Sequence, residues 1–89
     1  MAHAKPKDLK DIGELLVQIR ALKKLKEKTT GCFYLKSKAV LHFHVEAGRR
    51  FAHVFNGQSW LEIDIAAGPS TRNQIGSFEK IRKILPIEN

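Results

Sequence analysis

The chain has little cysteine, little methionine and no long apolar run. Its 89 residues include one cysteine, Cys32, which excludes an internal disulfide and a four-cysteine zinc site. No apolar segment approaches the roughly 20 residues that a membrane-spanning helix needs, and no secretory leader follows Met1. We therefore expect one small cytoplasmic domain over residues 1–89, with flexible tails at 1–7 and 87–89.

Acidic residues are also scarce. Nine Asp and Glu face 16 Lys and Arg, which gives a net charge of +7 and a pI near 9.9. Such an excess is typical of proteins that bind nucleic acid or another anionic partner, such as an acidic protein, although surface lysines are often only solvated. Basic side chains group near the end of the first expected helix and at the strand turns. These candidate anion-binding residues are Arg20, Lys23, Lys24, Lys28, Lys36, Lys38, Arg49 and Arg50.

Apolar and polar residues alternate between positions 39 and 65, which predicts three antiparallel strands joined by two tight turns. Side chains two apart lie on the same face of a strand. One face is therefore apolar, with residues such as Leu41, Val54 and Ile63. The other face is rich in histidine, carboxylate and aromatic side chains, so a function of this sheet belongs there.

Two-residue turns are predicted at Ala47-Gly48 and at Asn56-Gly57. The second rests on the type I′ turn, whose two positions need the positive φ that Asn and Gly adopt readily. The second turn would place Phe55 opposite Gln58. A bulged turn at Gly48 is the alternative for the first turn. It would move the side chains of the strand that carries His42 to the opposite face relative to the neighbouring strand. We prefer the two-residue turn because it keeps apolar residues opposite apolar residues.

The polar face suggests a metal site. Three imidazoles and nearby carboxylates suit zinc or another divalent ion, and the candidate ligands are His42, His44, His53, Glu62 and Asp64. With such an ion the protein would be a metal-assisted hydrolase or nuclease. Otherwise these are half-exposed strand histidines and no cofactor is expected. No nucleophile elbow or glycine-rich phosphate loop accompanies them, so a binding protein is favoured over an enzyme.

Three aromatic residues, Phe51, Phe55 and Trp60, share the histidine-rich face. If both helices cover the apolar face, these rings form an exposed patch suited to a homodimer or another structural interface. If one helix covers each face, they form a second small core. The pattern leaves both alternatives open.

The flanking segments predict helices. Apolar residues recur at three- and four-residue steps from Asp8 to about Lys28 and again between Ile75 and Leu85. The second helix begins either at the turn formed by residues 68–71 or, because Gly76 weakens its first turn, at a Ser77 N-cap. The segment Cys32–Leu35 predicts a further strand. The expected order is α-β-β-β-β-α, an α+β domain with an N-terminal helix, an antiparallel meander of three to four strands and a C-terminal helix.

Two strand motifs carry a resemblance. Residues 37–44 read S-K-A-V-L-H-F-H and residues 51–54 read F-A-H-V. They resemble an S-x-x-x-L-H-F-H strand and a following F-A-x-V strand in a group of small uncharacterised bacterial proteins. The resemblance covers about the middle third of the chain and implies no known activity. In that group the position of His53 is commonly acidic, so the resemblance supports the fold more than a three-histidine site.

Overall fold

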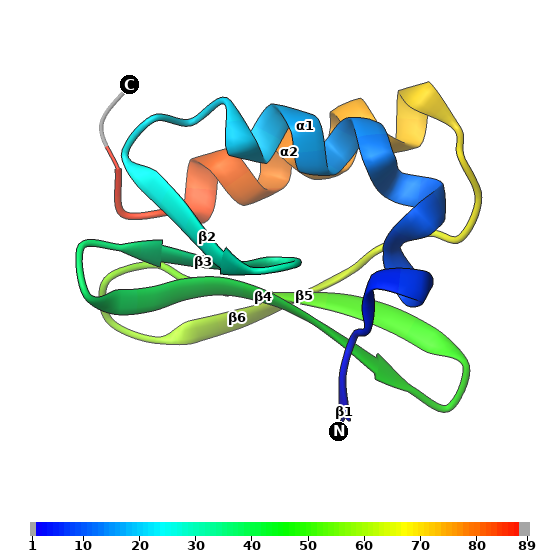
Figure 1. Ribbon diagram of the computed structural model, residues 1–89, viewed down its shortest axis with the longest axis horizontal. Coiled ribbons are helices and arrows are strands. Elements are labelled where there is room, and N and C mark those ends of the chain that lie inside the picture. Colours follow the sequence, from blue (N-terminus) through cyan, green and yellow to red (C-terminus); the bar gives the residue numbers. More distant parts are fainter. Residues whose placement is uncertain (1, 88–89) are drawn as a thin grey trace.

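The computed structural model describes residues 2–87, which form one antiparallel sheet and a single layer of helices on one side of it (Figure 1). The elements follow one another along the chain as β1 (Ala2–His3), η1 (Pro6–Ile12, a 3-10 helix), α1 (Gly13–Arg20), β2 (Leu25–Thr29), β3 (Cys32–Leu35), β4 (Lys38–Glu46), β5 (Arg49–Phe55), β6 (Trp60–Asp64) and α2 (Thr71–Ile84). The predicted α+β class is confirmed.

The sheet has more strands than predicted. Strands β2 to β6 lie in sequence order as a five-strand meander, and β1 pairs with the far half of β4. Residues 2–7, expected as a flexible tail, therefore form β1 and the start of η1. The flexibility expected of Met1 and of residues 88–89 lies outside the described residues. No helix within residues 2–87 is long and apolar enough to cross a membrane.

Both helices cover the same face of the sheet (Figure 1). Leu15 and Ile19 of α1 and Ile81 of α2 are fully buried against it, together with sheet residues such as Phe33 and Leu41. Burial of apolar area is the main source of stability in a domain of this size. The opposite face carries no helix among the described residues, so we call it the open face.

The first helix is shorter than the sequence predicts. Helix α1 stops at Arg20, and residues 25–28, expected to be helical, belong to β2. The chain turns where the N–H of Leu22 donates to the Ile19 carbonyl, and a hairpin then closes at Gly31 with a φ of +79°. Glu27 accepts the Gly31 N–H at 2.8 Å. Pairing with β3 therefore overrides the helical spacing of leucines, since strand formation depends on tertiary context.

The two central turns differ in outcome. The Ala47-Gly48 turn is a two-residue loop with φ of 51° and 76°, and it pairs His42 with His53, as predicted. The next loop has four residues, and within it the side chain of Asn56 accepts the backbone N–H groups of Gln58 and Ser59, each at 2.8 Å. Phe55 consequently pairs with Trp60 and not with Gln58.

Helix α2 begins earlier than Ser77. The Ser70 hydroxyl accepts the Asn73 N–H at 3.3 Å, so Ser70 is the N-cap. One turn later, the buried Gln74 accepts the N–H of Leu15 at 2.9 Å. That bond joins the start of α1 to α2 and satisfies one of the unpaired N–H groups at the helix start.

Candidate metal centre

All four histidines of the chain meet on the open face of the sheet. Strand register explains why. The pairing of β1 with β4 places His3 opposite His44, and the pairing of β4 with β5 places His42 opposite His53. Cross-strand partners share a face, and so do residues two apart on one strand. Three strands therefore bring four imidazoles together, and we call them the histidine cluster.

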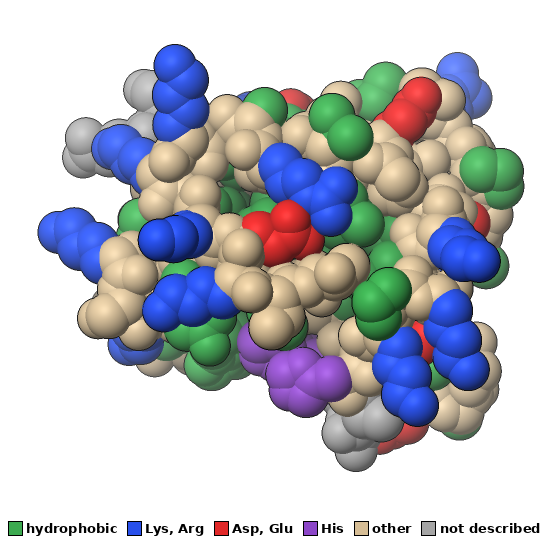
Figure 2. Space-filling model, viewed as in Figure 1, with side chains coloured by type: hydrophobic (Ala, Val, Ile, Leu, Met, Phe, Trp, Pro, Cys, Tyr) green, Lys and Arg blue, Asp and Glu red, His purple; other side chains and the backbone are tan. Residues whose placement is uncertain are grey.

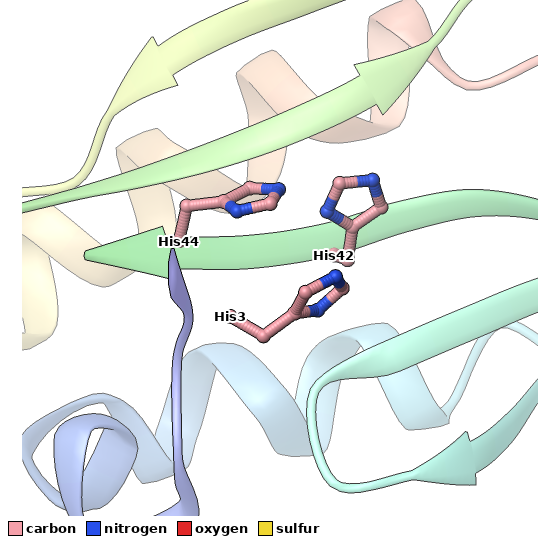
Figure 3. Close-up of side chains that lie close together, drawn as sticks. All are labelled: His3, His42 and His44. Carbon is pink, nitrogen blue, oxygen red and sulfur yellow. The ribbon is translucent and has the colours of Figure 1, made fainter. Parts of the chain in front are cut away.

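Three of these imidazoles are close enough for a shared ion. One ring nitrogen from each of His3, His42 and His44 lies within 4.8 Å of the others, and Figure 3 shows the three rings side by side. Two nitrogens bound about 2.0–2.1 Å from a tetrahedral ion lie about 3.4 Å apart. The three nitrogens would therefore have to approach one another by up to about 1.4 Å to share such an ion.

The environment favours a neutral imidazole at His42. Burial and, to a smaller extent, the neighbouring His44, His3 and His53 together lower the pKa of His42 to about 4. Its Nδ1 is buried without a hydrogen-bond partner in the part of the chain that the structure describes. His44 is 7% exposed. A neutral imidazole with an available nitrogen is the form that ligates a metal ion.

The fourth histidine has a different partner. Nε2 of His53 lies 2.9 Å from a carboxylate oxygen of Glu62, its cross-strand neighbour on β6. The ring of His53 lies 4.2 Å from that of His44, centroid to centroid. A carboxylate bonded to one ring nitrogen fixes the orientation of an imidazole. Glu62 thus orients His53 at the border of the cluster.

Of the predicted ligands, Asp64 lies apart from this arrangement. It forms an ion pair with Arg49 and stands opposite Phe51 in the sheet. The sequence did not predict His3 as a metal ligand, because a two-residue strand is too short for its sequence pattern to predict which distant strand it pairs with. Its only signal in the sequence was its residue type, as one of four histidines.

The predicted Lys/Arg surface is partly engaged within the fold. Arg20 pairs with Glu27, and Arg49 pairs with Asp64. The Arg50 guanidinium binds both carboxylate oxygens of Asp11, at 2.6 and 3.0 Å, and its side chain is 10% exposed. Arg50 also donates to two backbone carbonyls, so its bonds tie β5 to the segments before α1 and after β6.

The lysines of that set remain at the surface. Lys28 lies over the ring of Tyr34 at 4.5 Å and Lys38 over that of Phe55 at 4.1 Å. Three exposed lysines flank the α1–β2 connection and the β3–β4 turn; they are Lys23, Lys24 and Lys36. In Figure 2, basic side chains lie on both the left and the right of the molecule, and the histidines lie at its lower edge between them.

The aromatic patch is smaller than the sequence suggested. Phe51 and Phe55 are each only 9% exposed, whereas Trp60 is 43% exposed. Trp60 lies 4.8 Å from His42 and 5.4 Å from Phe55 by ring centroids. The exposed aromatic surface is thus a single ring beside the histidine cluster. A homodimer through this face stays a prediction, and the mass of the protein in solution tests it.

The class of protein defined by this fold and cluster is a small α+β domain with four histidines on the open face of its sheet. No protein-family model matches the chain, and no curated protein or solved structure matches it.

Proposed function

We propose that this protein binds a divalent transition-metal ion, of which zinc is the simplest example, through His3, His42 and His44. The observation that carries the proposal is the approach of their ring nitrogens to within 4.8 Å from two different strands. Imidazole nitrogen is a preferred ligand of zinc, copper and nickel. The lowered pKa of His42 supports it as well, because metal binding then displaces no proton from that ring near neutral pH.

Three protein ligands leave a position for a further ligand. Catalytic zinc sites have this composition, whereas structural sites are closed by four protein ligands. On the open face that position is accessible to water or to an anion. A metal-assisted hydrolase or nuclease is therefore a form of this proposal, in which the ion lowers the pKa of a bound water. The His53–Glu62 pair lies beside the three proposed ligands, where it would accept a proton.

The direct test is calorimetric titration of the untagged protein with zinc. We expect one ion per chain, and a loss of at least 100-fold in affinity for the double variant His42→Asn, His44→Asn. Lys7→Ala, Lys10→Ala is a matched control with two exposed changes in η1. Equal zinc affinity in the histidine variant and the wild type would refute the site, as would failure of the wild type to bind.

A second candidate function is contact with nucleic acid or another anionic partner. It is supported by the exposed Lys23, Lys24 and Lys36, for which no ion pair occurs within residues 2–87. Lysine contacts to phosphates release counterions, so affinity falls steeply as salt rises.

Fluorescence anisotropy with a labelled single-stranded oligonucleotide at 50 and 200 mM salt tests this candidate. Lys24→Ala, Lys36→Ala should weaken binding several-fold, and the Lys7→Ala, Lys10→Ala control should weaken it less. An equal loss of oligonucleotide affinity in the two variants would mean that binding depends on the net charge of the protein and not on Lys24 and Lys36.

A further inference from the structure

A surface groove of about 580 Å³ adjoins the histidine cluster. Its walls come from the segment that follows β1 and from the β2–β3 hairpin, and they include His3, Lys5, Lys28, Thr29, Thr30 and Tyr34. His3 therefore belongs both to the groove and to the proposed set of metal ligands. A ligand in this groove would lie next to the ion.

The groove is electrostatically one-sided. Lys5 and Lys28 line it, no carboxylate side chain does, and neither lysine forms an ion pair with another described residue. The Lys28 ammonium lies 4.5 Å from the centroid of the Tyr34 ring, which holds it at the groove wall by a cation–π contact. Positive charge without a partner in a concave site attracts anions.

The neutral groups select among anions. Thr29 and Thr30 also line the groove, and a threonine hydroxyl is a hydrogen-bond donor, as the ammonium groups of Lys5 and Lys28 are. A phosphate group offers three acceptor oxygens and close to two negative charges, more than a carboxylate offers. The volume also lies within the range of about 300–1,000 Å³ that small-molecule sites occupy, so it accommodates an organic group beside the phosphate.

We propose that this groove binds a phosphate monoester, with one phosphate oxygen completing the coordination of the ion held by His3, His42 and His44. Lys5 and Lys28 neutralise the phosphate and the two threonine hydroxyls donate to it. This inference rests on the proposed metal site, since His3 joins the two.

Cobalt-loaded protein provides the test, because the visible absorption of Co²⁺ reports its ligands. Addition of Co²⁺ alone measures the metal site, and addition of inorganic phosphate to the loaded protein measures the groove. We expect phosphate to change the Co²⁺ spectrum, and Lys5→Ala, Lys28→Ala to weaken phosphate binding at least tenfold with Co²⁺ affinity unchanged within twofold. Lys7→Ala, Lys10→Ala should leave both affinities unchanged.

Each failure has its own meaning. If Co²⁺ does not bind, the proposed function fails. If Co²⁺ binds while phosphate leaves the spectrum unchanged, or while Lys5→Ala, Lys28→Ala binds phosphate as the control does, the groove inference fails and the metal site stands. Acetate binding as tightly as phosphate also overturns the choice of phosphate.

A final pair of probes identifies the source of the phosphate. A hexanucleotide with a 5′-phosphate is compared with the same oligonucleotide without it. If the phosphorylated form binds more tightly than both its unphosphorylated counterpart and inorganic phosphate, the monoester is the end of a nucleic acid. If the phosphorylated form binds no more tightly than inorganic phosphate, the monoester is a small molecule. Either result retains the phosphate site.

Discussion

The two faces of the sheet use the same strands for opposite purposes. On β4, Phe43 points to the helix-covered face and is 2% exposed, while its neighbours His42 and His44 belong to the open face. The covered face holds apolar side chains whose identities are set by packing. The open face holds titratable side chains whose spacing suits a ligand. Neighbouring residues of β4 therefore have different roles: those on the covered face stabilise the fold, and those on the open face are the candidate ligands.

The largest expected effect tests that separation directly. Phe43→Ala removes a buried ring from the covered face and should lower the free energy of unfolding by about 3–5 kcal/mol. His42→Ala, one residue away, should lower it by about 1 kcal/mol or less, because His42 lies on the uncovered side. Urea denaturation measures both. A larger loss for His42→Ala would mean that the open face is a second core.

Metal binding should stabilise the protein through the open face alone. Zinc at 100 times its dissociation constant is expected to raise the free energy of unfolding by about 2.7 kcal/mol. The increase should vanish in His42→Ala and persist in a covered-face variant such as Ile81→Val. Thermal unfolding with and without zinc provides the measurement. Equal stabilisation of His42→Ala and wild type would show that zinc binds elsewhere.

The third prediction concerns the stability of the protein at low pH. It depends on the contact between Arg50 of β5 and Asp11 of η1, on the helix-covered side of the sheet. Hydrogen bonds from Arg50 hold the pKa of Asp11 at about 2, below its ordinary 3.8. A lowered carboxyl pKa contributes stability above the unfolded value, near pH 4, and that stability is lost as pH falls toward 2. Allowing for solvent screening, we expect about 1–2 kcal/mol.

Asp11→Asn should remove that contribution. The variant should be less stable than wild type at pH 6, and the difference should shrink steadily between pH 4 and pH 2. Urea denaturation across this range is the measurement. A difference that stays constant with pH would mean that Asp11 acts through packing and not through its charge.

The smallest expected effect tests whether the β5–β6 loop sets the register that determines which side chains lie on each face. Asn56→Ala removes the side-chain oxygen that accepts two backbone N–H groups in the β5–β6 loop. We expect a loss of about 0.5–1 kcal/mol, the size of a typical exposed hydrogen-bonded turn. NMR contacts between Phe55 and Trp60 should persist. Loss of those contacts would show that Asn56 alone sets the register.

Much of the sheet could be predicted from local chemistry. The Ala47-Gly48 turn and the pairing of His42 with His53 were correct, because glycine at positive φ and an apolar face specify one register. The Asn56 loop was predicted two residues too short. Because a shift of two residues leaves every side chain on its original face, the composition of both faces was still correct.

Other features depend on contacts between distant residues. Residues 25–28 have apolar spacing compatible with a helix, and only pairing with β3 makes them a strand. Arg50 was one of several surface cations by sequence, and only the fold brings Asp11 against it, 39 positions away. Of the two starts considered for the last helix, the turn at residues 68–71 is correct and the Ser77 cap is wrong, because Ser70 already accepts the N–H of Asn73.

By itself the sequence determined the alternation that divides the sheet into an apolar and a histidine-rich face, since side-chain direction in a strand follows from backbone geometry. Only the tertiary structure decided that both helices cover the apolar face and that β1 joins β4. The second decision brings His3 to His42 and His44. No local preference carries that information, because the partner of a strand is chosen by the hydrogen bonds and packing of the assembled sheet.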